Sequence, residues 1–352
     1  MGNIRLTHRR TRSYTNTFVG LIAGISTSVI MLCFPRSAQS AIPQQERDAL
    51  VALFNKLGGI NWTTKTGWLG PRGSECTWYG VTCDAAQASV IGVDLSGNGV
   101  MGRVPAEIGN LTNLQTLKMN ADYISSLPDE VGNLTNLQIL ELGDNTYFVG
   151  LPSTMGNLSQ LQVLLVSGGW IGGSIPAELG NLKQLRSLRI INYGHYYHQM
   201  GFTGSIPPEL GNLTNLQILE LDGNRLSGGI PAELGNLKNL KALNLSGNTY
   251  GGLGGSIPSS LGLLQNLQSL KLRSNGLRGD IPSTLFDLVN LQELDLGANY
   301  LTNIPTEIAG LTNLRVLHWC CSGLTSVPAE LGSLTNLQDL DLQGNNLSAG
   351  IP

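Results

Sequence analysis

The stretch Leu216–Asn239, LQILELDGNRLSGGIPAELGNLKN, decides the fold of this chain. Near-copies of it run from Val90 to the last residue. If its large apolar side chains are buried, they gain less free energy than ordering its 24 backbone units costs. One copy therefore cannot fold alone, whereas stacked copies share a core, which is the principle of a solenoid.

The first half of the copy predicts a short strand followed by a turn. Leu219 and Leu221 alternate with Glu220 and Asp222, which indicates a strand with one buried face. Asn224 follows where the chain must turn out of the strand. We expect its side chain to hydrogen-bond backbone groups of neighbouring turns, so that a column of Asn replaces missing ladder partners.

The second half predicts the opposite side of the coil. Gly228, Gly229 and Pro231 exclude a continuous helix there, and Ala232–Leu237 predicts one short helical or 3₁₀ turn. The whole pattern, LxxLxLxxNxLxGxIPxxLGNLxx, resembles the plant-type leucine-rich repeat of receptor-kinase ectodomains and polygalacturonase-inhibiting proteins. The resemblance implies an α/β solenoid, a right-handed superhelix with a concave parallel β-sheet and a short 3₁₀ or helical back.

Eleven copies are present, and residues 90–352 are expected to form eleven leucine-rich repeats, the last one incomplete. The copies begin at Val90, Leu114, Leu137, Leu161, Leu185, Leu216, Leu240, Leu267, Leu291, Leu314 and Leu337. Seven keep the turn asparagine, at Asn98, Asn145, Asn224, Asn248, Asn275, Asn299 and Asn345. The other four carry Asp122, Gly169, Tyr193 and Ser322.

Residues 1–40 have the features of a secretory signal peptide. Several Arg residues and no acidic ones precede an apolar run, Phe18–Phe34, and a small-residue cleavage site at residues 38–40. The alternative is an uncleaved signal anchor, and only then is membrane contact expected. The mature chain is expected to be secreted or at the cell surface. Without residues 1–40 it has 16 basic and 24 acidic residues, a net charge of −8, which argues against nucleic acid and anionic lipid as partners.

Residues 41–89 differ from the repeats and predict a cap over the open edge of the first strand. A helix is expected after Pro43, stopped by Gly58, and is followed by tryptophans and the run CTWYGVTC. This resembles the N-terminal cap of plant-type repeat proteins, with its motif W…CxWxGVxC. The resemblance implies a Cys76–Cys83 disulfide, which fits an oxidising compartment. The rival interpretation is a reactive or metal-binding pair, and no further ligand lies nearby in the sequence.

The largest departure from the repeat is an insertion in the fifth copy, YGHYYHQMG, from Tyr193 to Gly201. Aromatic residues gathered on an exposed rim suit recognition, because they bury a large area at little entropic cost. The hypothesis is a partner-binding rim made of Tyr147, Trp170, Arg189, Tyr193, His195, Tyr196, Tyr197 and His198. The rival interpretation is an inert loop whose aromatic side chains pack back onto the solenoid.

Neither metal nor cofactor is expected. His195 and His198 have ligand-like spacing, as do His318, Cys320 and Cys321, but the two sets lie five copies apart, about 24 Å at the spacing of neighbouring strands. Each set alone is too small. The outward strand positions form one column of mixed charge without an acid–base or nucleophile cluster.

The sequence therefore predicts a non-catalytic, secreted or cell-surface protein that binds a protein or peptide. By the resemblance, its partners are extracellular peptides, receptor ectodomains or secreted cell-wall hydrolases. The alternatives are a structural or adhesive surface protein and the ectodomain of a receptor-like kinase. An enzyme is disfavoured.

Overall fold

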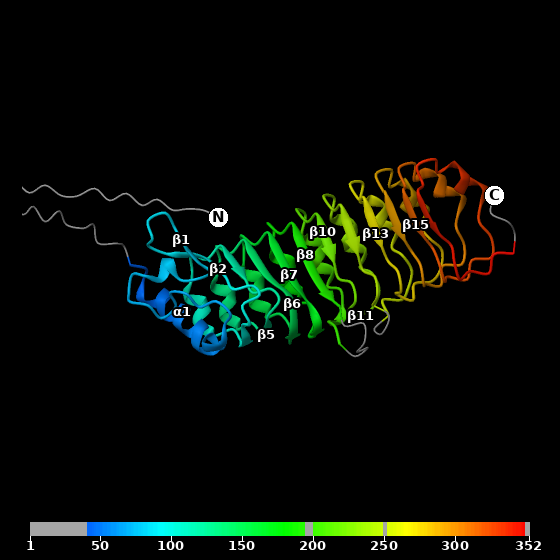
Figure 1. The fold of residues 1–352 in the computed structure, drawn as a ribbon. Helices are drawn as coiled ribbons and strands as arrows, with labels where there is room; N and C mark the ends of the chain where they lie inside the picture. The colour runs from blue at the N-terminus through cyan, green and yellow to red at the C-terminus, as the bar shows by residue number, and fades with distance from the viewer. Residues whose placement is uncertain (1–40, 194–199, 249–251, 349–352) are drawn as a thin grey trace, which may run out of the picture. The chain divides into compact units, whose positions relative to one another are not determined.

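The chain forms a repeating coil whose strands line one side (Figure 1). This computed structural model describes residues 41–193, 200–248 and 252–348. The expected signal peptide, residues 1–40, lies outside the described residues. The strand of each copy joins a single large sheet, because each copy can bury its leucines only against those of its neighbours.

The large sheet has twelve strands. The first two pair antiparallel, and every later neighbour pairs parallel. In spatial order the strands are β1 (Val81–Cys83), β2 (Val90–Asp94), β4 (Thr116–Lys118), β6 (Ile139–Phe148), β7 (Val163–Ile171), β8 (Ser187–Asn192), β10 (Ile218–Glu220), β12 (Ala242–Asn244), β13 (Ser269–Lys271), β14 (Glu293–Asp295), β15 (Val316–His318) and β16 (Asp339–Asp341).

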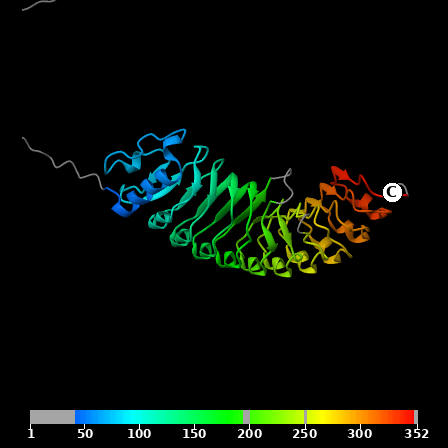
Figure 2. The ribbon, with the colours of Figure 1, turned by 90° about the horizontal axis from the view of Figure 1, so that it is seen from below.

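The opposite side carries short 3₁₀ helices, which form a row along the lower edge of the repeats in Figure 2. A proline in extended geometry precedes each of them, fixing φ and contributing no N–H to the turn. They are η3 (Ala106–Asn110), η4 (Asp129–Asn133), η5 (Ser153–Asn157), η6 (Ala177–Asn181), η7 (Pro208–Asn212), η8 (Ala232–Asn236), η9 (Ser259–Leu263), η10 (Ser283–Asp287), η11 (Thr306–Gly310) and η12 (Ala329–Ser333).

Two small parallel sheets lie where the chain leaves the large one. In the first, β3 (Met101–Arg103) pairs with β5 (Tyr123–Ser126). In the second, β9 (Thr203–Ser205) pairs with β11 (Arg225–Ser227). Together with the large sheet and the 3₁₀ row, they complete the solenoid expected from the repeat.

The predicted strand phase is confirmed. Leu219 and Leu221 are fully buried, whereas Glu220 between them points outward and is half-buried. The register repeats this phase in the flanking strands, where Leu188 and Leu243 lie opposite Leu219. The buried leucines of all copies belong to one continuous core.

The predicted asparagine column is also confirmed. Asn224 accepts a hydrogen bond from the backbone N–H of Phe202 in the preceding copy at 2.9 Å. Its amide donates to the carbonyls of Ile190, at 2.7 Å, and Leu221, at 3.0 Å. Buried backbone groups that leave the strand ladder are therefore satisfied by the side chain of the next coil.

The N-terminal cap covers the free edge of β2. Helix α1 (Gln44–Lys56) buries Glu46, whose Oε2 accepts a hydrogen bond from the N–H of Val90 at 2.7 Å. Strand β1 completes the edge, and Cys76 and Cys83 form the expected disulfide. Two shorter helices, η1 (Gly59–Asn61) and η2 (Glu75–Thr77), lie between α1 and β1.

The cap has its own aromatic core. Trp62 and Trp68 pack edge to face with ring centroids 5.0 Å apart, and Trp68 lies 5.0 Å from Trp78. Phe54 of α1 joins them at 5.2 Å from Trp62. Each indole N–H finds an acceptor: Trp62 donates to the Leu57 carbonyl, for example, at 2.9 Å. The tryptophans thus close the first coil with apolar area while leaving no indole donor unpaired.

Strands β6 and β7 run much further than the repeat pattern suggests. Their pairing continues past the turn with a register shift, from Asn145↔Gly168 to Phe148↔Ile171. A Cβ on Gly168 would stand only 1.7 Å from the Asn145 carbonyl oxygen. Gly168, which holds the same place in its copy as Gly223 does in the sixth, therefore allows the two backbones to stay paired.

We expect Leu221→Ala to lower the free energy of unfolding by about 2–5 kcal/mol, because the side chain is fully buried between two flanking strands. Glu220→Ala is the matched control. It removes a partly exposed ion pair and should cost about 1 kcal/mol or less. Chemical denaturation of both variants measures the difference, and equal losses would contradict the strand phase.

Asp122 gives a second prediction, because it occupies an asparagine position. Its Oδ1 accepts from Val100 N–H at 3.0 Å, while Oδ2 is buried without a hydrogen-bond partner in the described part of the chain. Burial raises the pKa of Asp122 to about 6. The folded state therefore disfavours the charged carboxylate, which lowers the free energy of unfolding. This loss is complete above the pKa of the folded state, and it disappears as the pH falls toward the pKa of the unfolded state.

Asp122→Asn should stabilise the fold by about 2–3 kcal/mol at about pH 7.5, and by only about 1 kcal/mol at about pH 4.5. The amide removes the buried charge and supplies the donor that Asn145 supplies in the next copy, where it bonds the Met119 carbonyl at 2.8 Å. Denaturation of both proteins at the two pH values measures the gap. A gap that does not change with pH would show that Asp122 does not titrate in this range.

Candidate functional site

From β2 onward, each strand of the large sheet contributes one residue to a single column on the concave face. Strand register places these residues opposite one another, as the sequence predicts: Asp94, Lys118, Glu141, Leu165, Arg189, Glu220, Asn244, Lys271, Asp295, His318 and Asp341. Neighbours in this column are one strand apart, so charged side chains of opposite sign meet across strands.

Most charges on this face are already paired. Lys118 lies 3.1 Å from Glu141, and Arg189 lies 2.9 Å from Glu220. Further along, Lys271 contacts Glu293 at 2.9 Å, and His318 contacts Asp339 at 3.0 Å. These pairs neutralise the face locally, and they connect strands rather than converging on one point.

The carboxylates without such ion pairs serve the backbone. Asp94 accepts a hydrogen bond from the N–H of Ser96 at 3.1 Å, and Asp341 accepts one from Gln343 at 3.0 Å. Both bonds close the turn two residues further on. These side chains therefore stabilise the end of each strand, and their geometry does not resemble a general acid or base aimed at a pocket.

Two free thiols lie at the end of β15. Cys320 is buried and accepts a hydrogen bond from Arg273 Nη1 at 3.0 Å, whereas Cys321 is exposed. Burial raises the pKa of the Cys320 thiol, although the Arg273 guanidinium acts in the opposite direction. A raised pKa keeps this thiol protonated and weakens it as a nucleophile.

The exposed aromatic residues lie on a different surface, the edge where the strands end. Tyr147 of β6 pairs with Trp170 of β7, and their ring centroids are 5.3 Å apart. Tyr147 is 50% exposed although Phe148, the next residue, is buried. The extension of both strands past the turn therefore fixes the two rings side by side on the surface.

Sequence reasoning missed a third ring on this edge. Tyr123 of β5 is 51% exposed and precedes the buried Ile124, just as Tyr147 precedes Phe148. The N–H of Val149 donates to the Ser125 carbonyl at 2.9 Å, which places the two copies side by side here. In most copies a buried apolar residue follows the turn, such as Ile124 or Phe148. A comparison of the residues that directly precede it in these copies would have found Tyr123.

The structure brings together only part of the predicted rim. Tyr193 is exposed, and its N–H bonds the Gly168 carbonyl at 2.8 Å, next to β7. Arg189 lies on the concave face in its pair with Glu220. His195, Tyr196, Tyr197 and His198 lie outside the described residues. We call the aromatic edge the set Tyr123, Tyr147 and Trp170.

Two further properties concern the described residues alone. No three of their His, Cys, Asp or Glu side chains come close enough to hold a metal ion. None of their helices is both long enough and apolar enough to span a bilayer.

Comparison with protein families agrees with the geometry. Residues 43–84 match the leucine rich repeat N-terminal domain. Residues 94–225 match the leucine-rich repeat region, and residues 215–237 and 265–319 match leucine rich repeat families.

Similar proteins come from Arabidopsis thaliana. Receptor protein-tyrosine kinase CEPR2 is 30% identical over 103 residues, which cover 29% of this chain and 10% of the kinase. The ectodomain of the receptor kinase GASSHO1/SCHENGEN3, solved with CASPARIAN STRIP INTEGRITY FACTOR 2, is 35% identical with a TM-score of 0.65; the match covers 79% of this chain and 38% of that one.

A third relative is the receptor kinase HAESA, solved with the peptide hormone IDA and the co-receptor SERK1. It is 31% identical with a TM-score of 0.61, and the match covers 77% of this chain and 48% of the solved chain. The chain therefore spans less than half the length of each of these relatives.

Proposed function

This chain is a leucine-rich-repeat protein with an N-terminal cap of the plant-receptor type, and we propose that it is a non-catalytic recognition module that binds a peptide or protein outside the cytoplasm. The aromatic edge carries the proposal. Two half-exposed tyrosines, Tyr123 and Tyr147, and the partly exposed Trp170 lie on successive coils, each just before a buried apolar residue. Such rings bind partners well because little side-chain entropy is lost.

The concave face supports the same conclusion by contrast. Its charges are paired across strands or bonded to the backbone, so a partner would have to compete with existing contacts. On the aromatic edge, Tyr123 and Tyr147 are about half exposed, and Tyr147 contacts Trp170. The proposed rim also includes Tyr193, Arg189 and the four residues outside the described part of the chain.

The cap supports an extracytoplasmic location. A Cys76–Cys83 disulfide persists in oxidising compartments, and the basic and apolar start of the chain has the pattern of a secretory signal. The solved relatives point in the same direction, since one ectodomain holds a peptide hormone and a co-receptor. Whether the partner of this chain is also a peptide is part of the proposal.

The test uses peptides selected by phage display on the full chain. Tyr147→Ala and Trp170→Ala should each weaken the selected peptides by about 2 kcal/mol, or about 30-fold, as expected for aromatic residues at the centre of an interface. Fluorescence anisotropy measures the affinities, and thermal unfolding verifies that the variants fold.

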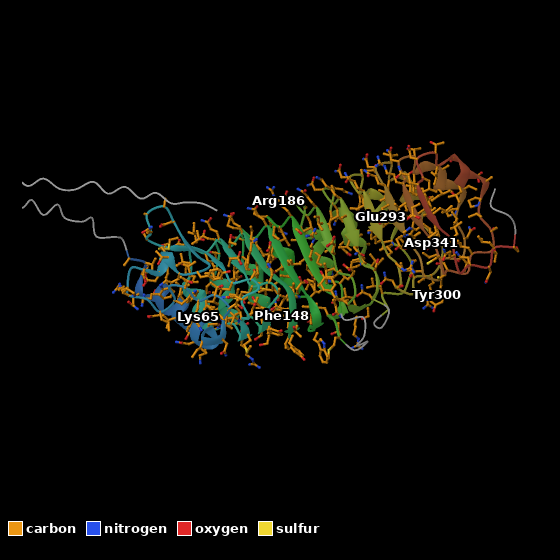
Figure 3. All side chains as sticks on the ribbon, viewed as in Figure 1. Lys65, Phe148, Arg186, Glu293, Tyr300 and Asp341 are labelled. Carbon is orange, nitrogen blue, oxygen red and sulfur yellow. A yellow bond between two sulfur atoms is a disulfide. The ribbon has the colours of Figure 1, made fainter. Side chains whose placement is uncertain are left out.

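Tyr300→Ala is the matched control. Tyr300 precedes the buried Leu301 of the ninth copy, as Tyr147 precedes Phe148, and it is 67% exposed. Phe148 and Tyr300 lie along the same lower edge in Figure 3, whereas Arg186 lies on the upper edge. If Tyr147→Ala, Trp170→Ala and Tyr300→Ala bound equally well, the site would not be the aromatic edge. If Lys271→Ala alone weakened binding, the site would lie on the concave face.

A further inference from the structure

Next to the aromatic edge the surface is hollowed across the first four copies. The hollow has a volume of about 520 Å³ and is lined by Arg103, Ser125, Ser126, Val149, Gly150 and Ser174, among others. Val149 lies two residues after Tyr147, and Ser174 lies four residues after Trp170. The hollow and the aromatic edge therefore belong to one continuous surface, on the same coils.

The length of the turns explains the hollow. In most copies a buried apolar residue follows the turn, and a proline comes a few residues later. In the first and fourth copies four residues separate the two, Met101–Val104 and Gly172–Ile175. The second and third copies place only three there, in Ser125–Leu127 and Val149–Leu151. Arg103 and Ser174 belong to the two longer turns and line the depression on either side of the shorter ones.

The same rule produces a second, smaller hollow, which supports this explanation. The ninth copy also has a short turn, and the eighth has a long one that ends in Asp280 and Ile281. Between them lies a depression of about 180 Å³, lined by Asp280, Thr302 and Asn303 among others. Its wall residue is acidic, whereas the wall residue of the larger hollow is basic.

The floor of the larger hollow is backbone. Gly150 and Gly173 both have positive φ, at +107° and +99°. A Cβ on Gly173 would come within 2.8 Å of the Gly150 Cα. The two glycines thus allow neighbouring coils to approach closely while leaving the space above them open. Hydroxyl groups of the lining serines supply hydrogen-bond donors at its side.

The hollow carries an unbalanced positive charge. Arg103 is exposed, is the single charged residue among those that line the hollow, and has no ion pair with any residue of the described part of the chain. A guanidinium in a concave, hydroxyl-lined site favours a carboxylate, which it can bind through two parallel hydrogen bonds. The hollow is therefore complementary in charge to an acidic side chain.

We infer that the hollow binds an Asp or Glu side chain of an extended peptide segment whose aromatic or aliphatic residue, about three or four positions away, packs on Tyr147 and Trp170. Arg103 belongs to the first copy, whereas Tyr147 and Trp170 belong to the third and fourth, two and three coils away. At about 4.8 Å per coil this is about 10–14 Å, which about three or four residues of extended chain span. This inference rests on the proposed function and adds the chemistry of the partner: an acidic and apolar peptide.

The experiment probes the purified full chain with an array of short synthetic peptides. Each peptide has one aromatic residue separated by two or three glycines from Asp or Glu, and each has partner peptides with Asn or Gln, and with Lys, instead. The wild-type chain should retain the acidic peptides about tenfold more strongly than the amide peptides. Arg103→Gln should abolish this preference, and Arg103→Glu should reverse it toward peptides that carry Lys.

Arg278→Gln is the matched control. Arg278 is also exposed and follows the buried Leu277 on the same edge, but it does not line the large hollow. It should leave the acidic preference unchanged, and unfolding midpoints should verify the fold of every variant. Equal retention of acidic and amide peptides, or an acidic preference that persists in Arg103→Glu, would overturn the inference. So would stronger retention of uronic-acid oligosaccharides than of any peptide.

The outcomes separate this inference from the proposed function. If Tyr147→Ala weakens all retained peptides and Arg103→Gln weakens none, recognition by the aromatic edge stands and the acidic specificity is wrong. If neither substitution changes retention, both proposals are wrong.

Discussion

The structure depends on a buried side-chain amide that belongs to one coil and bonds the backbone of another. At Asn224, Asn248 and Asn299 the amide donates to carbonyls and its oxygen accepts from a backbone N–H of the preceding copy. Leucines make the stack favourable, but they are interchangeable along the core and do not define where each turn begins. The asparagines define it, because a misplaced turn would leave these polar groups buried and unbonded.

The candidate site lies where this column is interrupted. The fourth copy has glycines in the turn, and there the backbones of β6 and β7 pair directly with each other instead of through a side-chain amide. The two strands consequently extend to the edge and hold Tyr147 against Trp170. The backbone pairing that continues past this turn therefore also positions the contact between Tyr147 and Trp170.

The sequence predicted the features that each copy repeats: the strand phase at Leu219 and Leu221, the asparagine column and the capping disulfide. The first two follow from periodicity and from the burial that it implies, whereas the disulfide was implied by the resemblance of CTWYGVTC to the cap of plant-type repeat proteins. It did not predict the extension of β6 and β7 or the role of Tyr123, because both depend on pairing between copies with different turns. The short turns of the second, ninth and tenth copies are visible in the sequence, yet only the packing of neighbouring coils shows that a short turn beside a long one leaves a hollow.

The dependence of the hollows on turn length has a consequence for how such a protein can vary. The register of the sheet is set by leucines and asparagines, so it is unchanged when one residue is lost between the buried turn position and the proline, as in the second and third copies. A deletion of one codon there would reshape the edge and leave the concave face intact. The two surfaces of this protein are therefore free to diverge separately, one through substitutions in its strands and the other through small changes of length in its turns.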